Sequence, residues 1–137
     1  MKEVIKDNIF FKHDKERSIF TDERGKIEDL LLFNNPRIDS VVKIISVKGA
    51  VRGNHYHKKT NQWTYIIKGK TRVVSKSCPG NHLHDIIAGD GMILYHEAGT
   101  AHAFQAIEDT EWLVFTEGPR KGNDYESDTF RLEKALI

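Results

Sequence analysis

The sequence has little cysteine, almost no net charge and no long apolar run. Its one cysteine, Cys78, excludes an internal disulfide and fits a reducing compartment such as the cytoplasm. The 21 basic and 20 acidic residues leave a net charge of +1, so nothing electrostatic favours nucleic acid or an anionic membrane as a partner. No segment approaches the roughly 20 apolar residues of a membrane-spanning helix, and residues 1–16 contain no apolar signal core. We therefore expect a cytoplasmic protein with no nucleic acid and no membrane partner.

Long helical periodicity is also absent, so short strands are the main predicted elements. The clearest is residues 41–47, a run rich in β-branched side chains. Further strands are predicted at residues 18–21, 62–67, 70–77, 82–87, 92–95, 102–107 and 111–116. Residues 26–33 fit either a strand or a helical turn, and the early break at residues 34–36 favours a strand. Because turns separate these strands at short intervals, they predict an all-β sandwich or barrel. We expect a single domain, residues 1–137, with a core at about residues 18–117.

Turns and the two ends of the chain complete the predicted layout. Asp22–Gly25 is a predicted turn, and Cys78–Asn81 is a predicted hairpin connection. Residues 1–17 are polar apart from Ile9–Phe11, and form either a strand or a loose arm. The charged tail, residues 118–137, is expected to pack on the domain or on a second subunit.

One predicted polar cluster, His55, His57 and Gln62, lies between Gly53 and Gly69, where two adjacent strands are expected. His55 and His57 are two residues apart, so a strand directs both to the same face. Gln62 follows after a short polar break and begins the next predicted strand. Burying unpaired polar groups costs free energy, so such a cluster inside an apolar β domain needs a reason. These three side chains are therefore predicted to share one functional space.

A third imidazole, His102, lies three residues after Gly99 at the start of a predicted strand. The spacings Gly-x-His-x-His-x4-Gln-x6-Gly and Gly-x7-Gly-x2-His resemble the two motifs that define cupins, over about residues 40–117. Two positions differ, because Gln62 stands where most metal-binding cupins have Glu, and Glu97 where the second motif usually has Pro. The resemblance implies a cupin jelly-roll barrel of antiparallel strands.

Within cupins, Arg52–Lys58 and Asp22–Gly25 look like the sugar-nucleotide members. These include 3,4-ketoisomerases of dTDP-4-keto-6-deoxyglucose, rhamnose-pathway 3,5-epimerases and the cupin domain of a capsule-synthesis reductase-epimerase. The ketoisomerases have Gln after His-x-His and use no metal, whereas the capsule domain has Glu and a zinc ion. The resemblance implies a homodimeric keto-isomerase or epimerase that acts on a nucleotide-linked 4-keto-6-deoxyhexose in deoxysugar or polysaccharide biosynthesis.

By analogy, His55 and His57 form the acid/base pair, because an imidazole takes and gives protons near neutrality. Tyr95 is a further candidate proton donor. The candidate substrate-binding residues are Arg52, Asn54, Gln62 and Tyr65. Arg52 suits a pyrophosphate, since a guanidinium forks onto phosphate oxygens, but a structural salt bridge is an equal expectation. Alternation along the strand also allows Tyr65 to face away from Gln62.

The same atoms allow a metal site. His55, His57 and His102, with the weaker neutral ligand Gln62, make a reasonable site for Zn, Fe, Ni or Mn. The first interpretation requires no cofactor, so the metal remains an alternative.

Two further functions stay open: a metal-dependent cupin such as a small-molecule dioxygenase, and a non-catalytic sugar- or metabolite-binding module. Other histidines have no comparable support. His82 and His84 are expected on the surface of a hairpin, and His96 borders the mouth of the site only if the cupin register holds.

Overall fold

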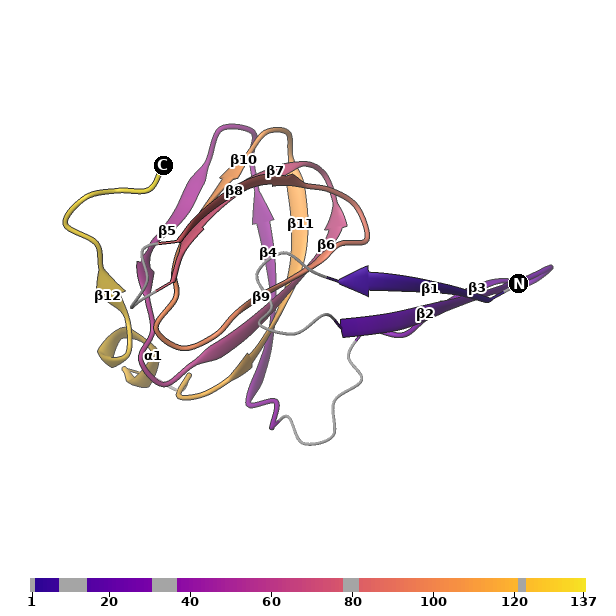
Figure 1. Ribbon diagram of the computed structural model, residues 1–137, viewed down its shortest axis with the longest axis horizontal. Helices are drawn as coiled ribbons and strands as arrows, with labels where there is room; N and C mark the ends of the chain where they lie inside the picture. The colour runs from indigo at the N-terminus through magenta and orange to yellow at the C-terminus, as the bar shows by residue number, and fades with distance from the viewer. Residues whose placement is uncertain (1, 8–14, 31–36, 78–81, 121–122) are drawn as a thin grey trace.

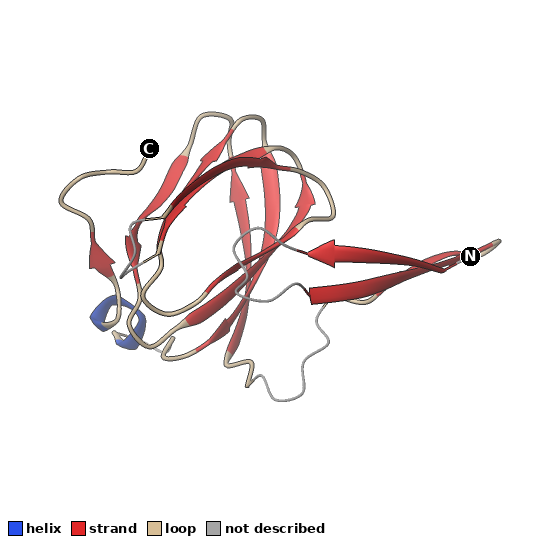
Figure 2. Cartoon of the chain, in the orientation of Figure 1, coloured by secondary structure: helices blue, strands red, loops and turns tan. Residues whose placement is uncertain are grey.

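The structure is a computed structural model that describes residues 2–7, 15–30, 37–77, 82–120 and 123–137. Its strands are β1 (Lys2–Asp7), β2 (Lys15–Asp22), β3 (Gly25–Glu28), β4 (Ser40–Ser46), β5 (Val51–Tyr56), β6 (Asn61–Lys68), β7 (Thr71–Lys76), β8 (Leu83–Ala88), β9 (Ile93–His96), β10 (Ala101–Ala106), β11 (Thr110–Glu117) and β12 (Phe130–Arg131). A one-turn helix, α1 (Asp124–Ser127), is the one helical element in the described residues (Figure 2). The predicted all-β class is therefore confirmed.

Two antiparallel sheets face each other and form a jelly roll (Figure 1). One sheet has the order β12-β5-β10-β7-β8, and the other has the order β4-β11-β6-β9. A third sheet, β1-β2-β3, projects away from this body. A hydrogen bond of 3.3 Å from the Tyr65 hydroxyl to Glu28 Oε2 connects the projecting sheet to β6.

The sequence of β11 shows how strand alternation builds the interior. Its buried residues are every second one, namely Thr110, Trp112, Val114 and Thr116. The residues between them are partly exposed on the outer face, as expected when side chains alternate across a pleated strand. The long inward side chains of β11 therefore meet those of β10 from the opposite sheet.

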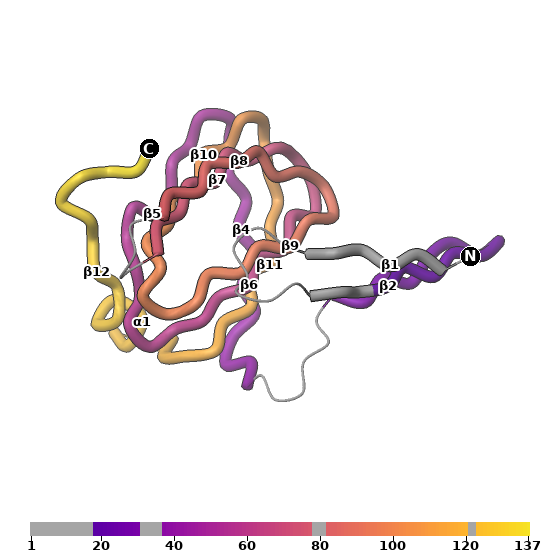
Figure 3. The backbone as a smooth tube through the Cα atoms, viewed as in Figure 1, coloured from indigo at the N-terminus to yellow at the C-terminus, as the bar shows by residue number. Residues whose placement is uncertain are grey.

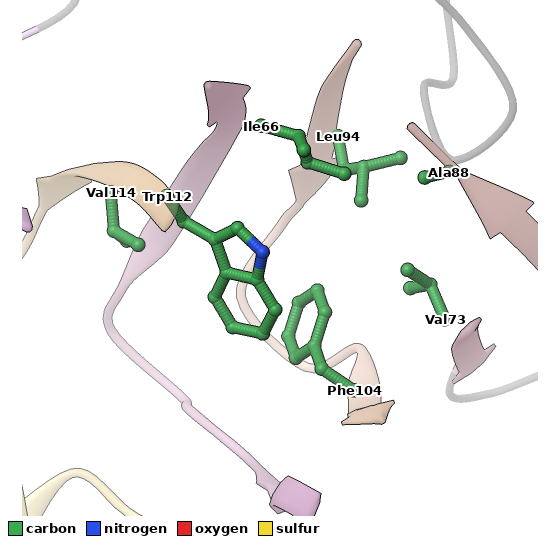
Figure 4. Packing of buried hydrophobic residues seen from close by; sticks show 7 residues of the cluster. All are labelled: Ile66, Val73, Ala88, Leu94, Phe104, Trp112 and Val114. Carbon is green, nitrogen blue, oxygen red and sulfur yellow. The ribbon is translucent and has the colours of Figure 1, made fainter. Parts of the chain in front are cut away.

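A cluster of buried apolar side chains fills the space between the two sheets (Figure 4). Its members are Ile66, Val73, Ala88, Leu94, Phe104, Trp112 and Val114. The Phe104 and Trp112 rings pack with centroids 5.0 Å apart at 48°. Burial of each large apolar side chain contributes roughly 1.5–3 kcal/mol. The core is offset from the histidines, and Phe104 and Trp112 mark the boundary, since they also line the cavity described below.

The C-terminal segment, described at residues 118–120 and 123–137, lies beside β5 through its strand β12 (Figure 3). Its strand β12 pairs with β5, so that Phe130 lies opposite Tyr56 and Arg131 opposite His55. The Phe130 and Tyr56 rings stack at 5.3 Å. The tail therefore packs on its own domain, which is one of the two arrangements expected from the sequence.

Some expected elements differ in extent or lie outside the description. Strand β3 ends at Glu28, well short of the strand predicted at residues 26–33, and the chain is not described at 31–36. Ile9–Phe11 and Cys78–Asn81 also lie outside the described residues. Strand β5 ends at Tyr56, so His57 follows the strand instead of belonging to it. No helix in the described part of the chain has the length and apolarity to cross a membrane.

Candidate functional site

Three of the predicted side chains meet where β5 and β10 run side by side. His102 at the start of β10 is paired with His55 near the end of β5, and their ring centroids are 4.9 Å apart. His57 lies 4.8 Å from His55 and 5.5 Å from His102 by the same measure. One ring nitrogen from each of the three residues lies within 4.8 Å of the others. Such a cluster can hold a cation or exchange protons.

A β-bulge explains how β5 presents its histidine at this point. The pairing register shifts between His102 and Ala103, so that Asn54 is an extra residue in β5. Asn54 has φ 56°, and Gly53 has φ 91°. A Cβ atom on Gly53 would lie 2.7 Å from the His102 carbonyl oxygen. Glycine is therefore required here, both for the backbone conformation and for the close approach of the two strands.

A backbone carbonyl fixes the orientation of His57. The Nδ1 atom of His57 lies 3.0 Å from the Asp128 carbonyl oxygen. A carbonyl can only accept, so Nδ1 carries the proton and Nε2 of the neutral ring has a free lone pair. That Nε2 atom is buried and has no hydrogen-bond partner in the structure. The His57 side chain is 2% exposed, so it supports the cavity from behind instead of lining it.

His102 is held in the same way. Its Nδ1 atom donates to the Thr100 carbonyl oxygen at 3.0 Å, which again leaves Nε2 unprotonated in the neutral ring. Carbonyl groups that fix the tautomer of an imidazole are a common support for metal-binding histidines. In His55, the Nδ1 atom is buried and has no hydrogen-bond partner. The triad thus contains two nitrogen atoms, Nδ1 of His55 and Nε2 of His57, for which the described residues supply no partner.

Burial keeps these imidazoles neutral. It lowers the pKa of His55 to about 4, and the nearby charges of His57 and Arg131 add to the effect. Burial also lowers the pKa of His57, where the Asp128 carbonyl and carboxylate oppose the shift and Arg120 adds to it. Neutral imidazoles can accept a proton or donate a lone pair to a cation.

A fourth histidine, His96, lies behind the triad. Its ring is buried 4.9 Å from the His102 ring, and β9 pairs it with Gln62 of β6. Burial lowers the pKa of His96 to about 3, with a contribution from His57. The pKa of His102 is also well below its usual value, first through burial and then through the neighbouring histidines, while the Thr100 carbonyl opposes the shift. The sequence offered little support for His96, because its place depends on strand register.

The histidines border a cavity of about 330 Å³ between the two sheets. Volumes of this order accommodate small ligands. Its polar lining residues include His55, Gln62, Thr64 and His102, and its apolar wall includes Phe104, Trp112 and Val114. Three arginines, Arg52, Arg120 and Arg131, complete the lining with Tyr125, and the described lining includes no carboxylate. The cavity therefore favours an anionic ligand.

Asp128 attaches the C-terminal segment to this site. Its side chain is 4% exposed, and its carboxylate accepts hydrogen bonds from the backbone N–H groups of Lys58 and Lys59, each at 3.0 Å. The Thr60 hydroxyl donates a further bond at 2.8 Å. Through its carbonyl the same residue orients His57, so the loop after β5 and the C-terminal segment are fixed together.

The predicted substrate-binding residues have different surroundings. Gln62 and Arg52 line the cavity, and Arg52 donates to the Ser46 hydroxyl at 2.7 Å and the Ile45 carbonyl at 3.2 Å. These partners are neutral, and no salt bridge of Arg52 occurs within the described residues. Asn54 instead accepts from the Leu136 N–H at 2.7 Å, so it holds the C-terminal end of the chain.

Two predicted tyrosines do not line the cavity. Gln62 and Thr64 of β6 point inward, so alternation places Trp63 and Tyr65 on the outer face of that sheet. Tyr95 packs there against Trp63, with ring centroids 5.0 Å apart. Burial raises the pKa of Tyr95 to about 12, with Glu97 and Glu117 adding to the shift. The expectation that Tyr95 and Tyr65 act within the cavity is corrected by strand alternation, and Tyr125 is the tyrosine that lines it.

Four functional candidates in the C-terminal segment were not identified from the sequence. They are Arg120, Tyr125, Asp128 and Arg131. The segment has no strong periodicity, and its place beside β5 depends on hydrogen bonds made far along the chain. The one sequence feature that could have pointed to these residues is the combination of arginine and aromatic residues after the last predicted strand. The paired rings of His82 and His84 are 6.2 Å apart and lie outside the cavity, on and beside β8.

Comparison with known proteins identifies the family and the fold. The family model described as Cupin matches residues 14–134. Among curated proteins, the chain is 34% identical over 85 residues to the oxalate decarboxylase OxdC of Bacillus subtilis, which covers 61% of this chain and 21% of that protein. The chain thus spans about a fifth of the length of this relative.

Two solved structures with the same fold are sugar-nucleotide enzymes. A dTDP-4-dehydrorhamnose 3,5-epimerase from Sulfolobus tokodaii has a TM-score of 0.70 and 21% identity, covering 87% of this chain and 77% of that one. The QdtA 3,4-ketoisomerase from Thermoanaerobacterium thermosaccharolyticum, a double mutant in complex with TDP, has a TM-score of 0.66 and 22% identity, covering 95% and 86%. At these identities the likeness establishes the fold.

Proposed function

Because the chain belongs to the cupin family, we propose that it is a keto-isomerase or epimerase acting on a nucleotide-linked 4-keto-6-deoxyhexose. The observation that carries this proposal is the cavity itself, which combines neutral imidazoles with three arginines and no carboxylate in its described lining. A sugar carrying a diphosphate meets both features. The names of the two similar sugar-nucleotide enzymes agree with this choice.

The reaction is a proton transfer at a carbon next to the keto group. His55 is the proposed base, since it is neutral, lines the cavity and has an unpaired buried Nδ1. It removes the proton from that carbon, and the electron pair moves onto the carbonyl oxygen to form an enediolate. Delivering the proton to the former carbonyl carbon moves the keto group, with the hydroxyl proton passing from the first oxygen to the second. Inversion instead needs a proton donor on the opposite face of the first carbon, while the base keeps the proton that it removed. Both outcomes leave the atoms and charge of the substrate unchanged.

His57 has a supporting role in this proposal. Its side chain is too buried to reach a sugar carbon directly, but it contacts His55 and keeps a free Nε2 beside it. Tyr125 lines the cavity 5.3 Å from His57 and takes the place expected of Tyr95 as proton donor to the substrate oxygen. Arg52 and Gln62 contact the bound substrate from the cavity wall.

A divalent cation fits the triad. The buried Nδ1 of His55 and Nε2 of His57 have no partner, and carbonyl groups orient His57 and His102 as they do in metal-binding histidines. His55, His57 and His102 would hold the ion, with the Gln62 amide oxygen as a weaker fourth ligand. Such an ion supplies a Lewis acid that polarises a carbonyl oxygen. In that state Tyr125 is the remaining cavity group able to exchange a proton.

We also propose that the protein is a homodimer. Strand β4 is at an edge of its sheet, and its residues Val41 and Ile45 are 56% and 60% exposed. An exposed apolar strand edge is a liability that proteins normally cover. The projecting sheet β1-β2-β3 of a second copy is an occupant of suitable shape. The substrate and a second copy are then the partners, with no nucleic acid or membrane involved.

A metal-dependent reaction on a small carboxylate is the second candidate. The identity to an oxalate decarboxylase and the unpaired imidazole nitrogens favour it. It predicts metal-dependent conversion of oxalate to formate and carbon dioxide, whereas the sugar-nucleotide proposal predicts no loss of oxalate. Measuring formate release after loading with Mn²⁺ separates the two.

Solvent deuterium tests the first proposal. The protein is incubated in D₂O with a dTDP-linked 4-keto-6-deoxyhexose, and the sugar is analysed by proton NMR and mass spectrometry. We expect one or more ring positions beside the keto group to gain deuterium, together with a new sugar isomer. His55→Asn removes the proposed base and is expected to lower the rate by about 100-fold or more.

His82→Asn is the matched control, because it makes the same chemical change on an exposed histidine outside the cavity. It is expected to retain the wild-type rate. Equal rates in His55→Asn and wild type, or no label in the sugar with either apo or metal-loaded protein, contradict the proposed function.

A further inference from the structure

We propose that the C-terminal segment carries the phosphate-recognition site of the cavity, with Arg120 and Arg131 binding the diphosphate of the substrate. The choice of a diphosphate ester rests on the proposed function, whereas the anion site itself rests on the structure. Both arginines line the cavity from one wall, and Arg52 lines it from β5. The segment therefore acts as a specificity element in addition to covering β5.

Arg120 stacks on an aromatic ring, and both residues line the cavity. Its guanidinium carbon lies 4.1 Å from the centroid of the Tyr125 ring, and that ring lies 5.3 Å from His57. Stacking on an aromatic face orients a guanidinium while its N–H groups remain available. Arg120 forms no salt bridge within the described part of the chain. Its positive charge is thus directed at the site without a carboxylate to neutralise it.

Arg131 reaches the site from the strand that joins the segment to β5. Strand pairing places it opposite His55, and its guanidinium is 2.9 Å from Glu126 of the same segment. Both partners of this ion pair are well exposed to solvent. Exposed pairs of this kind contribute little free energy, so Glu126 can yield to a phosphate.

The electrostatics of the histidines agree with this placement. Arg131 contributes to the low pKa of His55, and Arg120 contributes to that of His57. The geometry gives the same placement, because strand pairing sets Arg131 opposite His55, and Arg120 lies over the Tyr125 ring, which is 5.3 Å from the His57 ring. An anion bound between them would lie next to the proposed base and would offset the accumulated positive charge.

Asp128 makes the arrangement rigid before a ligand arrives. Asp128 lies between Arg120 and Arg131 in the sequence. Its buried carboxylate accepts hydrogen bonds from the backbone of Lys58 and Lys59, and so attaches the segment to the loop after β5. A preformed site avoids the entropy cost of ordering long side chains on a mobile segment. Guanidinium groups match phosphate oxygens in paired hydrogen bonds, and a diphosphate offers enough oxygens for several such pairs.

Calorimetric titration tests the site without requiring turnover. Inorganic pyrophosphate, dTDP and oxalate are titrated into wild type, Arg120→Gln, Arg131→Gln and the double variant. We expect each single substitution to weaken pyrophosphate and dTDP binding about tenfold or more, because bonds to charged groups are the strong ones. Arg72→Gln is the matched control, since Arg72 pairs with Asp85 outside the cavity, and binding is expected to stay within about twofold of wild type.

The titrations distinguish between the anion site, its assignment to a diphosphate and the proposed function. The site is refuted if the double variant retains its fold by circular dichroism yet binds pyrophosphate as tightly as Arg72→Gln, or if wild type binds neither phosphate compound. Oxalate binding that is tighter than pyrophosphate binding and depends on both arginines overturns the diphosphate assignment. Arginine-dependent binding of dTDP, without any turnover of a 4-keto sugar nucleotide, supports this site and counts against the proposed function alone.

Discussion

At the residue scale, the site depends on how backbone carbonyls hold imidazole rings. His57 and His102 each donate from Nδ1 to a carbonyl, so each keeps an unprotonated Nε2. The adjacent position Gln62 offers an amide in place of a carboxylate. A neutral ligand set attracts a dication less strongly than a charged one. Replacing the Gln62 amide by a carboxylate tests this difference.

Gln62→Glu is expected to tighten Zn²⁺ binding by about tenfold or more, equivalent to about 1.4 kcal/mol. The added negative charge is buried in the cavity and is available to the ion. The same change is expected to lower the melting temperature of the metal-free protein, because a buried charge then has no partner. Competition with a chromophoric chelator measures the affinity.

Gln105→Glu provides the matched control for that experiment. It lies on β10 outside the cavity lining, and it should leave the zinc affinity unchanged. Equal zinc affinities for Gln62→Glu and wild type would show that position 62 does not reach the ion.

Gly53→Ala tests the close contact between β5 and β10. The added Cβ would meet the His102 carbonyl, and the residue would keep an unfavourable positive φ. Such strain costs about 1–3 kcal/mol, so the melting temperature should fall by several degrees. Gly89→Ala is the control, since its Cβ would meet nothing within 4 Å. A melting temperature for Gly53→Ala equal to that of Gly89→Ala would show that β5 and β10 tolerate greater separation.

Residue spacing, together with its resemblance to the cupin motifs, predicted part of this site. His55, His57, His102 and Gln62 follow from the two glycine-punctuated motifs, and the structure brings them together. Tyr95 was expected to act in the cavity and Tyr65 either to do so or to face away from Gln62, and strand alternation places both on the outer face. His96 depends on the register between β6 and β9, which a single sequence does not specify.

At the scale of elements, the C-terminal segment and the loop after β5 form one unit. The strands were predictable because β-branched runs and glycine turns are local signals. The position of the C-terminal segment was not predictable, because it is set by hydrogen bonds of Asp128 and Asn54. Each of these bonds joins residues that are about 70 to 80 positions apart in the sequence. Such contacts leave no periodic pattern in the sequence. The one-turn helix α1 is also too short to produce a helical signal.

Asp128→Ala is expected to disconnect this unit. It leaves two backbone N–H groups and the Thr60 hydroxyl without their acceptor, which costs about 1–3 kcal/mol for each buried group that stays unsatisfied. The backbone carbonyl that orients His57 remains in this variant, but the segment that carries it is no longer anchored by the carboxylate, so zinc affinity should fall together with thermal stability. Asp128→Asn keeps one acceptor oxygen and should have an intermediate effect.

Asp85→Ala is the control for this substitution, since it removes an exposed aspartate that pairs with Arg72. It should change neither zinc affinity nor melting temperature by much. If Asp128→Ala behaves like Asp85→Ala in both measurements, the segment is not an anchor of the site.

At the scale of the whole molecule, two facing sheets enclose an apolar core and, beside it, a polar cavity. Three buried histidines, His57, His96 and His102, and the half-buried His55 lie at the polar side, and burial lowers the pKa of each of them. The fold therefore holds them uncharged, whereas the unfolded chain can protonate them near pH 6.5. This difference couples the stability of the whole domain to pH.

The metal-free protein is expected to lose stability as the pH falls from 7 to 5. In this range the unfolded state binds more protons than the folded state, so the free energy of unfolding decreases with a slope of up to about 1.4 kcal/mol per pH unit for each such histidine. The part of the free energy of unfolding that depends on the neutral histidines is fully present above about pH 6.5. Urea unfolding at several pH values in the presence of a chelator measures it. A free energy of unfolding that is constant or rises between pH 7 and pH 5 would contradict the burial of neutral imidazoles.

The most direct test of the central arrangement is ¹⁵N NMR of the histidine rings in metal-free protein at pH 7, repeated after one equivalent of Zn²⁺. The account predicts neutral rings for His57 and His102 with the proton on Nδ1, and a shift of their Nε2 signals together with a signal of His55 when zinc is added. Protonated imidazolium rings, protons on Nε2, or zinc-induced shifts confined to His82 and His84 would contradict it.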